Sequence, residues 1–239
     1  MEELLFKKGD KNPDFQAGSI IIVDKPLTWT SFNVVSKIRY IISRKLNIKK
    51  IKVGHAGTLD PLATGLLIIC TGKQTKNINE YQGQIKEYTG TFTIGATTPS
   101  YDLETEVNET FPTEHLTNEL VHKTTEQFLG TIQQRPPIFS ALKKDGKRLY
   151  ELARKGETTE IPTREITINE FEITNIEFPK IDFRVVCSKG TYIRSLAFDF
   201  GKALNSGAHL SALRRTKIGK FPVEKAVSIN DFIENLEKE

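Results

Sequence analysis

The stretch GHAGTLDPLATGLLIIC, Gly54–Cys70, holds a single carboxylate, Asp60, in a loop of small residues. Glycines such as Gly57 let another molecule approach the backbone closely. Pro61 disfavours the α region for Asp60 and favours an extended or turn conformation. The apolar run Leu66–Ile69 predicts a buried strand or the start of a helix. A rigid loop that precedes a buried element and presents one acid is a common setting for a catalytic carboxylate.

An Asp-Pro pair in a glycine-rich loop is usually only a turn. Here the complete string matches every fixed position of G-H-x-G-x-L-D-P-x-A-x-G-x-L, and that pattern resembles the signature of the tRNA-acting TruB family of pseudouridine synthases. The resemblance extends from Gly18 to about Phe221. It implies an enzyme that converts uridine to pseudouridine and needs no cofactor.

Four further segments resemble motifs of the same family. They are DKPLTWTSFNVV (24–35), KEYTGTFTIGATTPSYD (86–102), CSKGTYIRSLAFDFG (187–201) and LRRTKIGKF (213–221). The resemblance implies that Arg194 pairs with Asp60 and keeps it ionised, and that Tyr192 is a candidate for a later proton transfer. It also places Lys25 and Asp102 near the active cleft. Without it, Arg194 is a solvated charge early in a helix, Tyr192 is the edge of a core, and the other two are loop charges.

Three more residues acquire a role from the resemblance. It implies that Tyr88 stacks on the flipped uracil, that Leu213 contacts this base, and that His55 fills the gap the base leaves in the RNA. From the residues alone, Tyr88 shares a face with Phe92 and Ile94 and is a core aromatic. A lone histidine is mostly structural.

A basic stretch occupies the place where the family carries an inserted RNA-gripping segment, about residues 133–160. Its cations are Lys143, Lys144, Lys147, Arg148, Arg154 and Lys155. A solvated helix face is the ordinary interpretation of such a run. Cations interleaved with Phe139 and Tyr150 also suit phosphate binding with local stacking.

The composition is typical of a soluble globular protein, with 239 residues, 38% hydrophobic and 27% charged. A net charge of +4 is compatible with a nucleic-acid partner. Cys70 and Cys187 lie in apolar runs and are expected to be buried thiols. No Cys/His spacing predicts a metal site, and no signal peptide or membrane span is recognisable. We therefore expect a cytoplasmic monomer.

The order of the predicted elements indicates an α+β protein. Helices are expected from Ser31, as the N-cap, to about Leu46 and from about Thr117 to Leu129, and period-two alternation predicts a strand over 85–94. Strands and helices are mixed without regular βαβ alternation. The resemblance implies the pseudouridine synthase fold, a mixed, largely antiparallel sheet flanked by helices. We expect a polar arm over 1–17, a catalytic domain over 18–239, and no C-terminal PUA domain.

The implied substrate is the T-arm of tRNA, at uridine 55. Attack of Asp60 on C6 of the base, attack on C1′ of the ribose, and assistance to deprotonation of the sugar all remain open. Two other classes of function compete. A tRNA-binding folding chaperone would use the basic stretch without catalysis. An aspartate-based glycosidase usually needs a second carboxylate, and none occurs within Gly54–Gly65.

Overall fold

The computed structural model describes residues 5–6, 9–10, 13–140, 142–144, 146–153 and 160–237. Its contacts divide the chain into two compact units, and the expected domain bounds, 1–17 and 18–239, stay a prediction. Unit 1 comprises Met1–Tyr88 and Leu213–Glu239, and unit 2 comprises Thr89–Ala212. The boundaries fall inside two long strands, β4 (Lys86–Ile94) and β12 (Ala208–Ile218).

A mixed sheet contains most of the strands. Its other members are β1 (Ile20–Lys25), β2 (Val53–His55), β3 (Ala63–Thr71), β7 (Gly130–Gln134), β10 (Arg164–Glu177), β11 (Lys180–Cys187) and β13 (Phe221–Pro222). The strand order is β1-β3-β12-β4-β11-β10-β7, with β2 beside β3 and β13 beside β12. β3 and β12 pair in parallel, whereas β1–β3, β2–β3, β10–β11 and β7–β10 are antiparallel. The expected α+β class with a largely antiparallel sheet is confirmed.

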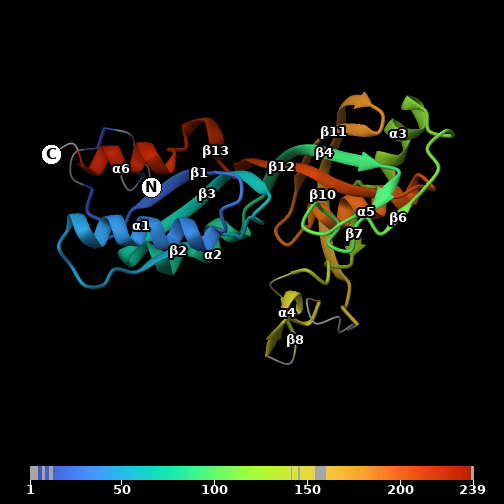
Figure 1. Ribbon diagram of the computed structural model, residues 1–239. Helices are drawn as coiled ribbons and strands as arrows, with labels where there is room; N and C mark the ends of the chain where they lie inside the picture. The colour runs from blue at the N-terminus through green and yellow to red at the C-terminus, as the bar shows by residue number, and fades with distance from the viewer. Residues whose placement is uncertain are drawn as a thin grey trace. The chain divides into compact units, whose positions relative to one another are not determined.

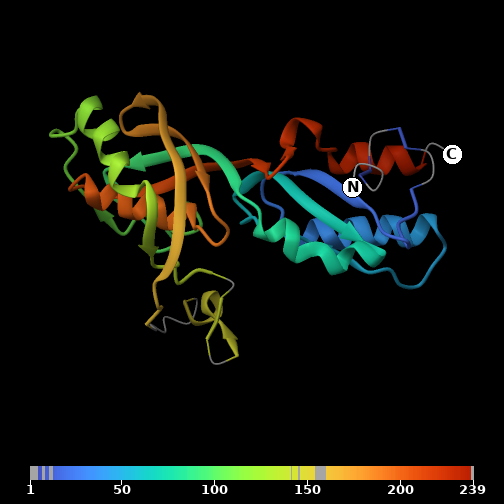
Figure 2. The same cartoon turned by 180° about the vertical axis from the view of Figure 1, so that it is seen from behind.

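In unit 1, β1 and β3 are buried on both faces. On one face Ile21, Val23 and Leu67 pack with α1 (Ser31–Lys45) and α6 (Ile229–Glu237), which Figure 1 shows along β1. On the other face Ile20, Ile22, Leu66 and Ile68 pack with Tyr81 of α2 (Ile78–Gly83), the helix seen beside β3 in Figure 2. Leu66–Ile69 thus belongs to the strand β3 and does not begin a helix. Its continuous apolar run is explained by burial of the strand on both faces.

The N-terminal end of α1 differs from the prediction. Thr30, and not Ser31, is the N-cap, because the Thr30 hydroxyl accepts from the backbone N–H of Asn33 at 3.0 Å and the Asn33 side chain accepts from the N–H of Thr30 at 2.9 Å. The Ser31 hydroxyl instead accepts from the N–H of Leu59 at 2.8 Å and donates to its carbonyl at 3.2 Å. Ser31 therefore ties the start of α1 to the loop that carries Asp60.

The segment expected to be a polar arm contributes two aromatic rings to the core of unit 1. Phe6 and Phe15 are buried and lie 5.1 Å and 6.1 Å, centroid to centroid, from Phe232 of α6. Phe232 lies on the apolar face of the amphipathic helix that the sequence predicted near the C-terminus. Burial of three aromatic side chains connects the two ends of the described chain.

Unit 2 is built around a cluster of phenylalanines that includes Phe92, Phe171, Phe183 and Phe200. Its remaining elements are β5 (Ala96–Thr97), β6 (Glu109–Thr110), α3 (Asn118–Thr125), β8 (Lys143–Lys144), β9 (Lys147–Arg148), α4 (Leu149–Ala153) and α5 (Ile193–Ala203). The predicted helix over 117–129 is α3 followed by a 3₁₀ turn, Glu126–Phe128. Short 3₁₀ helices also occur in unit 1, at Gly72–Asn77 and Val223–Lys225.

Candidate active site

Asp60 lies in the loop between β2 and β3 of unit 1 and is half-buried. Its carbonyl accepts from the N–H of Ala63 at 3.1 Å, which closes a turn directly before β3. The next carbonyl, of Pro61, accepts from the N–H of Thr28 at 2.9 Å. Together with the two bonds between Ser31 and Leu59, these contacts fix the backbone on both sides of the carboxylate.

Arg215 of β12 also holds this loop, through hydrogen bonds to its backbone and to β3. The sequence did not lead us to expect this role. Its side chain is almost fully buried, and Nε donates to the Leu66 carbonyl at 2.7 Å while Nη2 donates to the Gly57 carbonyl at 3.2 Å. Gly65 has φ +102°, and a Cβ there would lie 2.3 Å from the Arg215 carbonyl oxygen, so only glycine fits. Strand alternation, which places Arg214 and Arg215 on opposite faces, was the one available signal.

Lys25 ends β1 and is fully buried. Its ammonium donates to the carbonyls of Trp29 at 2.6 Å and Pro26 at 2.9 Å. Burial lowers the pKa of Lys25 to about 8, an effect that the negative charge of Asp60 opposes and the positive charge of Arg215 reinforces. The structure thus places Lys25, Asp60 and Arg215 close enough for their charges to interact.

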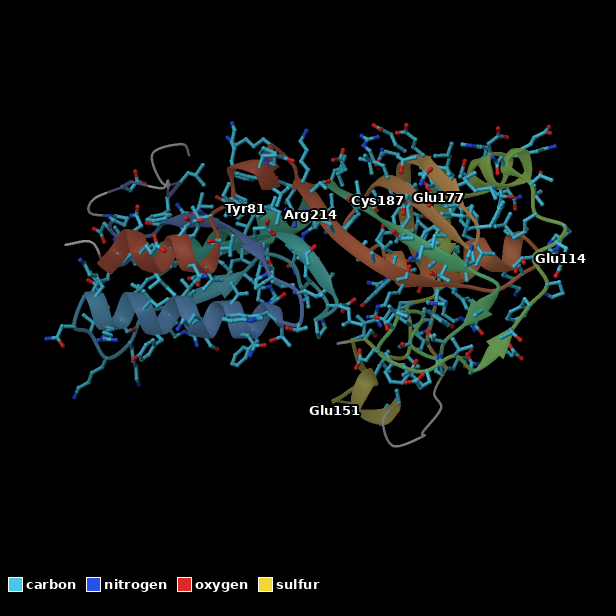
Figure 3. All side chains as sticks on the ribbon, turned by 45° about the horizontal axis from the view of Figure 1, so that its top comes forward. Tyr81, Glu114, Glu151, Glu177, Cys187 and Arg214 are labelled. Atoms are coloured by element: carbon cyan, nitrogen blue, oxygen red, sulfur yellow. The ribbon has the colours of Figure 1, made fainter. Side chains whose placement is uncertain are left out.

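The residues directly before Lys25 and Arg215 form an ion pair that is more exposed than either of them. Arg214, labelled in Figure 3, donates Nη1 and Nη2 to the two carboxylate oxygens of Asp24 at 3.0 Å and 2.7 Å. This bidentate contact links β1 and β12 at the residues directly before Lys25 and Arg215.

His55 is the last residue of β2 and pairs with Ile69 of β3. Burial lowers the pKa of its imidazole, a backbone hydrogen bond with Gly57 opposes this, and the charge of Arg215 lowers the pKa further. Nδ1 is buried and has no hydrogen-bond partner in the part of the chain that the structure describes. A neutral imidazole at pH 7 suits packing against a base or sugar better than binding to a phosphate.

Tyr88 and Leu213 lie on the two long strands. Tyr88 of β4 is buried, with 8% of its surface exposed, so it is a core aromatic as its strand position indicates. Leu213 of β12 is half-buried and pairs in parallel with Ala63, the first residue of β3 after the Asp60 loop. Leu213 is therefore placed beside the end of that loop.

Unit 2 contains the second group of predicted residues. Arg194, the second residue of α5, is buried, so its interpretation as a solvated charge is wrong. Its Nε lies 3.6 Å from Oδ2 of Asp102, an ion pair between two buried side chains, and Nη1 and Nη2 donate to the carbonyls of Ser100 at 3.3 Å and Phe139 at 2.9 Å. The structure thus brings Arg194 and Asp102 together. The predicted pairing of Arg194 with Asp60 joins residues of different units and stays a prediction.

Tyr192 precedes α5 and is held by two residues that sequence reasoning also missed. Gln134 accepts from the N–H of Tyr192 at 2.8 Å and donates to its carbonyl at 3.1 Å. The guanidinium carbon of Arg164 lies 4.6 Å from the centroid of the Tyr192 ring, a cation–π contact. Gln134 and Arg164 face each other across the β7–β10 pair. Neither gave a signal in the sequence, because their role depends on a strand pairing between distant segments.

The basic stretch includes a short antiparallel hairpin of β8 and β9, which pairs Lys143 with Arg148 and Lys144 with Lys147. α4 follows directly, and Figure 3 labels its Glu151. The side chains of these four basic residues lie outside the described part of the structure, as do residues 154–159 with Arg154 and Lys155. The predicted phosphate contacts of Lys143, Lys147 and Arg148 therefore remain predictions.

Other features bear on which chemistries are available. Among the described residues, no group of three or more His, Cys, Asp or Glu side chains could hold a metal ion. No described helix is both long and apolar enough to cross a membrane. Cys70 and Cys187 are buried free thiols, as expected, and burial raises the pKa of Cys70 to about 12.

Comparison with known proteins gives concordant matches along the sequence. Residues 43–193 match the family model described as TruB family pseudouridylate synthase (N terminal domain), and residues 194–239 match tRNA pseudouridylate synthase B C-terminal domain. The tRNA pseudouridine synthase B of Flavobacterium johnsoniae is 65% identical over 225 residues, which cover 94% of this chain and 98% of that protein. The protein of the same name from Phocaeicola vulgatus is 58% identical over 226 residues, or 95% and 96% of the two chains.

Two solved structures are similar over nearly the whole chain. One is described as a Cbf5-Nop10-Gar1 complex (TM-score 0.68, 29% identity) and the other as an H/ACA RNP bound to a substrate RNA containing 2′-deoxyuridine (TM-score 0.66, 27% identity). They cover 95% and 96% of this chain, which spans 60% and 61% of the length of theirs. The fold is thus that of the pseudouridine synthases. With a family model that matches more than half of its length and relatives of this identity, the chain belongs to the TruB family of pseudouridylate synthases.

Proposed function

We propose that this enzyme isomerises uridine to pseudouridine at position 55 in the T-loop of tRNA, with Asp60 as the catalytic carboxylate. The observation that carries the proposal is the support of the Asp60 loop. Buried Lys25, Arg215 and Ser31 hydrogen-bond its backbone or that of its flanks, and Asp60 is the one carboxylate of the loop. The relatives named tRNA pseudouridine synthase B support tRNA as the substrate class.

The reaction breaks the N1–C1′ bond of uridine and forms a C5–C1′ bond. The proton leaves C5, N1 ends protonated, and no electron or group is transferred to a second molecule, so the chemistry requires no cofactor. A carboxylate suits the step that detaches the base, because it is a competent nucleophile and also a good leaving group. Asp60 then acts at C6 of the base, at C1′, or on deprotonation of the sugar, and Tyr192 is the candidate for transfer of the C5 proton.

The target base must leave the RNA stack before any of this chemistry. In the proposal Tyr88 stacks on the extruded uracil, an interaction worth roughly 1–3 kcal/mol per base. Leu213 contacts the same base, and His55 occupies the position that it leaves in the RNA. The neutral state of His55 and the position of Leu213 beside β3 support these roles.

Arg194 is proposed to pair with Asp60 and to keep the carboxylate ionised while RNA excludes water. Its ion pair with Asp102 supports this role, since a buried guanidinium fixed by a second carboxylate has a defined direction. The β8–β9 hairpin and its flanks are proposed to grip the T-arm. We propose that the enzyme does so in the cytoplasm as a monomer.

The test is release of tritium from a tRNA transcript labelled at C5 of its uridines, followed by mapping of the modified position. The parent enzyme is expected to release tritium at the T-loop uridine, while Asp60→Asn binds the RNA without release. Activity retained by Asp60→Asn would overturn the proposed mechanism. Tight tRNA binding by a parent that releases no tritium would favour the folding chaperone, and release from a different uridine would refute position 55.

A further inference from the structure

Arg164 occupies a fixed position next to Tyr192 in unit 2. It is the first residue of β10 and pairs with Gln134, the last residue of β7. Gln134 is buried and binds the Tyr192 backbone through both its amide oxygen and its amide nitrogen. The guanidinium of Arg164 covers the Tyr192 ring at 4.6 Å. The cation therefore lies against the side chain to which we assign the proton transfer.

Two nitrogens of this guanidinium, Nε and Nη2, are buried and have no hydrogen-bond partner among the residues that the structure describes. They form one edge of the group, the side-on fork that binds two acceptor atoms at once. On the opposite side, a Cβ on Gly190 would lie 3.4 Å from Nη1, so the 188–190 turn lies along that end. Buried polar atoms without a partner are rare in native proteins, and each calls for an explanation.

A cavity of about 630 Å³ adjoins this residue. Arg164 lines it together with mainly apolar residues, among them Leu142, Leu149 and Ile161, and Glu160 is the one acid among the described residues of its lining. Its volume falls within the range of about 300–1,000 Å³ usual for small-molecule sites, and such sites combine apolar walls with a few polar groups that fix orientation. Leu142 and Leu149 belong to the basic stretch, so the cavity connects that segment to the surroundings of Tyr192.

We propose that this cavity is a substrate-binding site, in which Arg164 donates its Nε/Nη2 fork to two adjacent acceptor atoms of a nucleotide that neighbours the target uridine. The inference rests on the proposed function, because it takes RNA as the ligand. Two sources supply such a pair of acceptors. The non-bridging oxygens of a phosphodiester are one, and the O6 and N7 atoms on the edge of a guanine are the other. Either contact satisfies the fork and orients the RNA chain beside Tyr192.

The experiment measures the dissociation constant of a T-arm stem-loop RNA over a series of salt concentrations. All variants carry Asp60→Asn, so that binding is measured without turnover. Arg164→Gln is expected to raise the dissociation constant about ten- to a hundredfold, as loss of a bidentate contact does. Arg164→Lys, which keeps the charge but not the fork, should restore little of the affinity. The matched control is Arg184→Gln. In the parent, Nη1 of Arg184 pairs with the exposed Glu170 at 2.7 Å, and loss of this pair should leave RNA affinity unchanged.

The two sources of acceptors give different results. For a phosphodiester in the loop, Arg164→Gln also lowers the slope of log affinity against log salt by about 0.7. For a guanine edge, the slope is kept, and RNA in which 7-deazaguanine replaces guanine binds the parent and the variant equally. A dissociation constant for Arg164→Gln within twofold of the Arg184→Gln control would overturn the inference. Failure of the proposed function gives a different pattern, in which the Asp60→Asn protein without a further substitution does not bind the stem-loop, or the protein with Asp60 intact releases no tritium.

Discussion

Arg194 and Asp102 form a buried ion pair in unit 2, with Nε 3.6 Å from Oδ2 and only 4% and 7% of the two side chains exposed. The other two nitrogens of Arg194 donate to backbone carbonyls, and Oδ1 of Asp102 accepts from the N–H of Glu104 at 2.9 Å. These additional hydrogen bonds restrict the orientation of both buried charged side chains. The pair therefore fixes the direction of the guanidinium on which the proposed ionisation of Asp60 depends.

Asp102→Asn is expected to lower both stability and turnover. Removal of one partner leaves a buried cation without its counter-charge, which costs about 3–5 kcal/mol of the free energy of unfolding. The rate of tritium release in a single turnover should fall, whereas affinity for the T-arm should change less. Urea denaturation and single-turnover kinetics measure the two effects. Glu170→Gln, which breaks a largely exposed pair with Arg184, is the control and should cost about 1 kcal/mol or less. A variant with the parent's stability and rate would refute this role for the pair.

Arg215→Lys tests whether the bonds beneath the Asp60 loop matter for catalysis. Lysine keeps the charge but cannot reach the Leu66 and Gly57 carbonyls with the same planar geometry. Buried acceptors left without a donor cost about 1–3 kcal/mol each, so we expect lower stability and a lower kcat with RNA affinity nearly unchanged.

The neighbouring variant Arg214→Lys is the matched control for Arg215→Lys. Arg214 pairs with Asp24 at 2.7 Å, and 40% of its side chain is exposed, so its replacement should cost less stability. The idea fails if Arg215→Lys releases tritium at the parent's rate. Equal losses of kcat in both variants would assign the effect to the strand as a whole rather than to the loop.

Local periodicity explains which parts of the fold could be predicted. The run Leu66–Ile69 and the alternation of Tyr88, Phe92 and Ile94 reflect burial within one strand, and the strands β3 and β4 follow from them. The cap of α1 was assigned one residue late, because adjacent hydroxyls at Thr30 and Ser31 are equally good caps in sequence. The reciprocal hydrogen bonds of Thr30 with Asn33 and the contact of Ser31 with Leu59 distinguish them.

The support of the site could not be predicted for a different reason. Arg215 and Gln134 act on backbone carbonyls and N–H groups, which every residue carries, so no sequence pattern marks their partners. Arg164 and Gln134 meet through a strand pairing between segments about thirty residues apart. The burial of Phe6 and Phe15 likewise depends on α6 at the far end of the chain. The Asp60 loop could be identified as a candidate site from the sequence, because its motif is one continuous stretch of residues.

Neutralisation of the basic residues of the β8–β9 hairpin should lower the affinity for RNA and make that affinity less dependent on salt. In a variant with Lys143, Lys144, Lys147 and Arg148 all replaced by Gln, each lost phosphate contact is expected to lower the slope of log affinity against log salt by about 0.9. The measurement is the dissociation constant of tRNA from low to physiological salt. The matched control replaces four other cations by Gln, the exposed Arg44, Lys45, Lys49 and Lys50 near the end of α1. An unchanged slope in the hairpin variant, or the same change in both variants, would place the RNA contact elsewhere.

Asp199 of α5 should destabilise the protein at neutral pH. Burial raises its pKa to about 6 from the usual 3.8 of an aspartate, although the charges of Lys202 and Arg135 lower it. Between those pH values the folded state holds a proton that the unfolded chain has lost, so stability from this group is complete below pH 3.8 and is lost as pH rises through about 6. Asp199→Asn is therefore expected to be more stable than the parent by about 1–2 kcal/mol at pH 7.5, after allowance for partial exposure, and no more stable near pH 4. Urea denaturation at both pH values measures this, with exposed Glu172→Gln as the control. A stability difference that is the same at both pH values would show that the carboxylate acts through its contacts and not through its protonation.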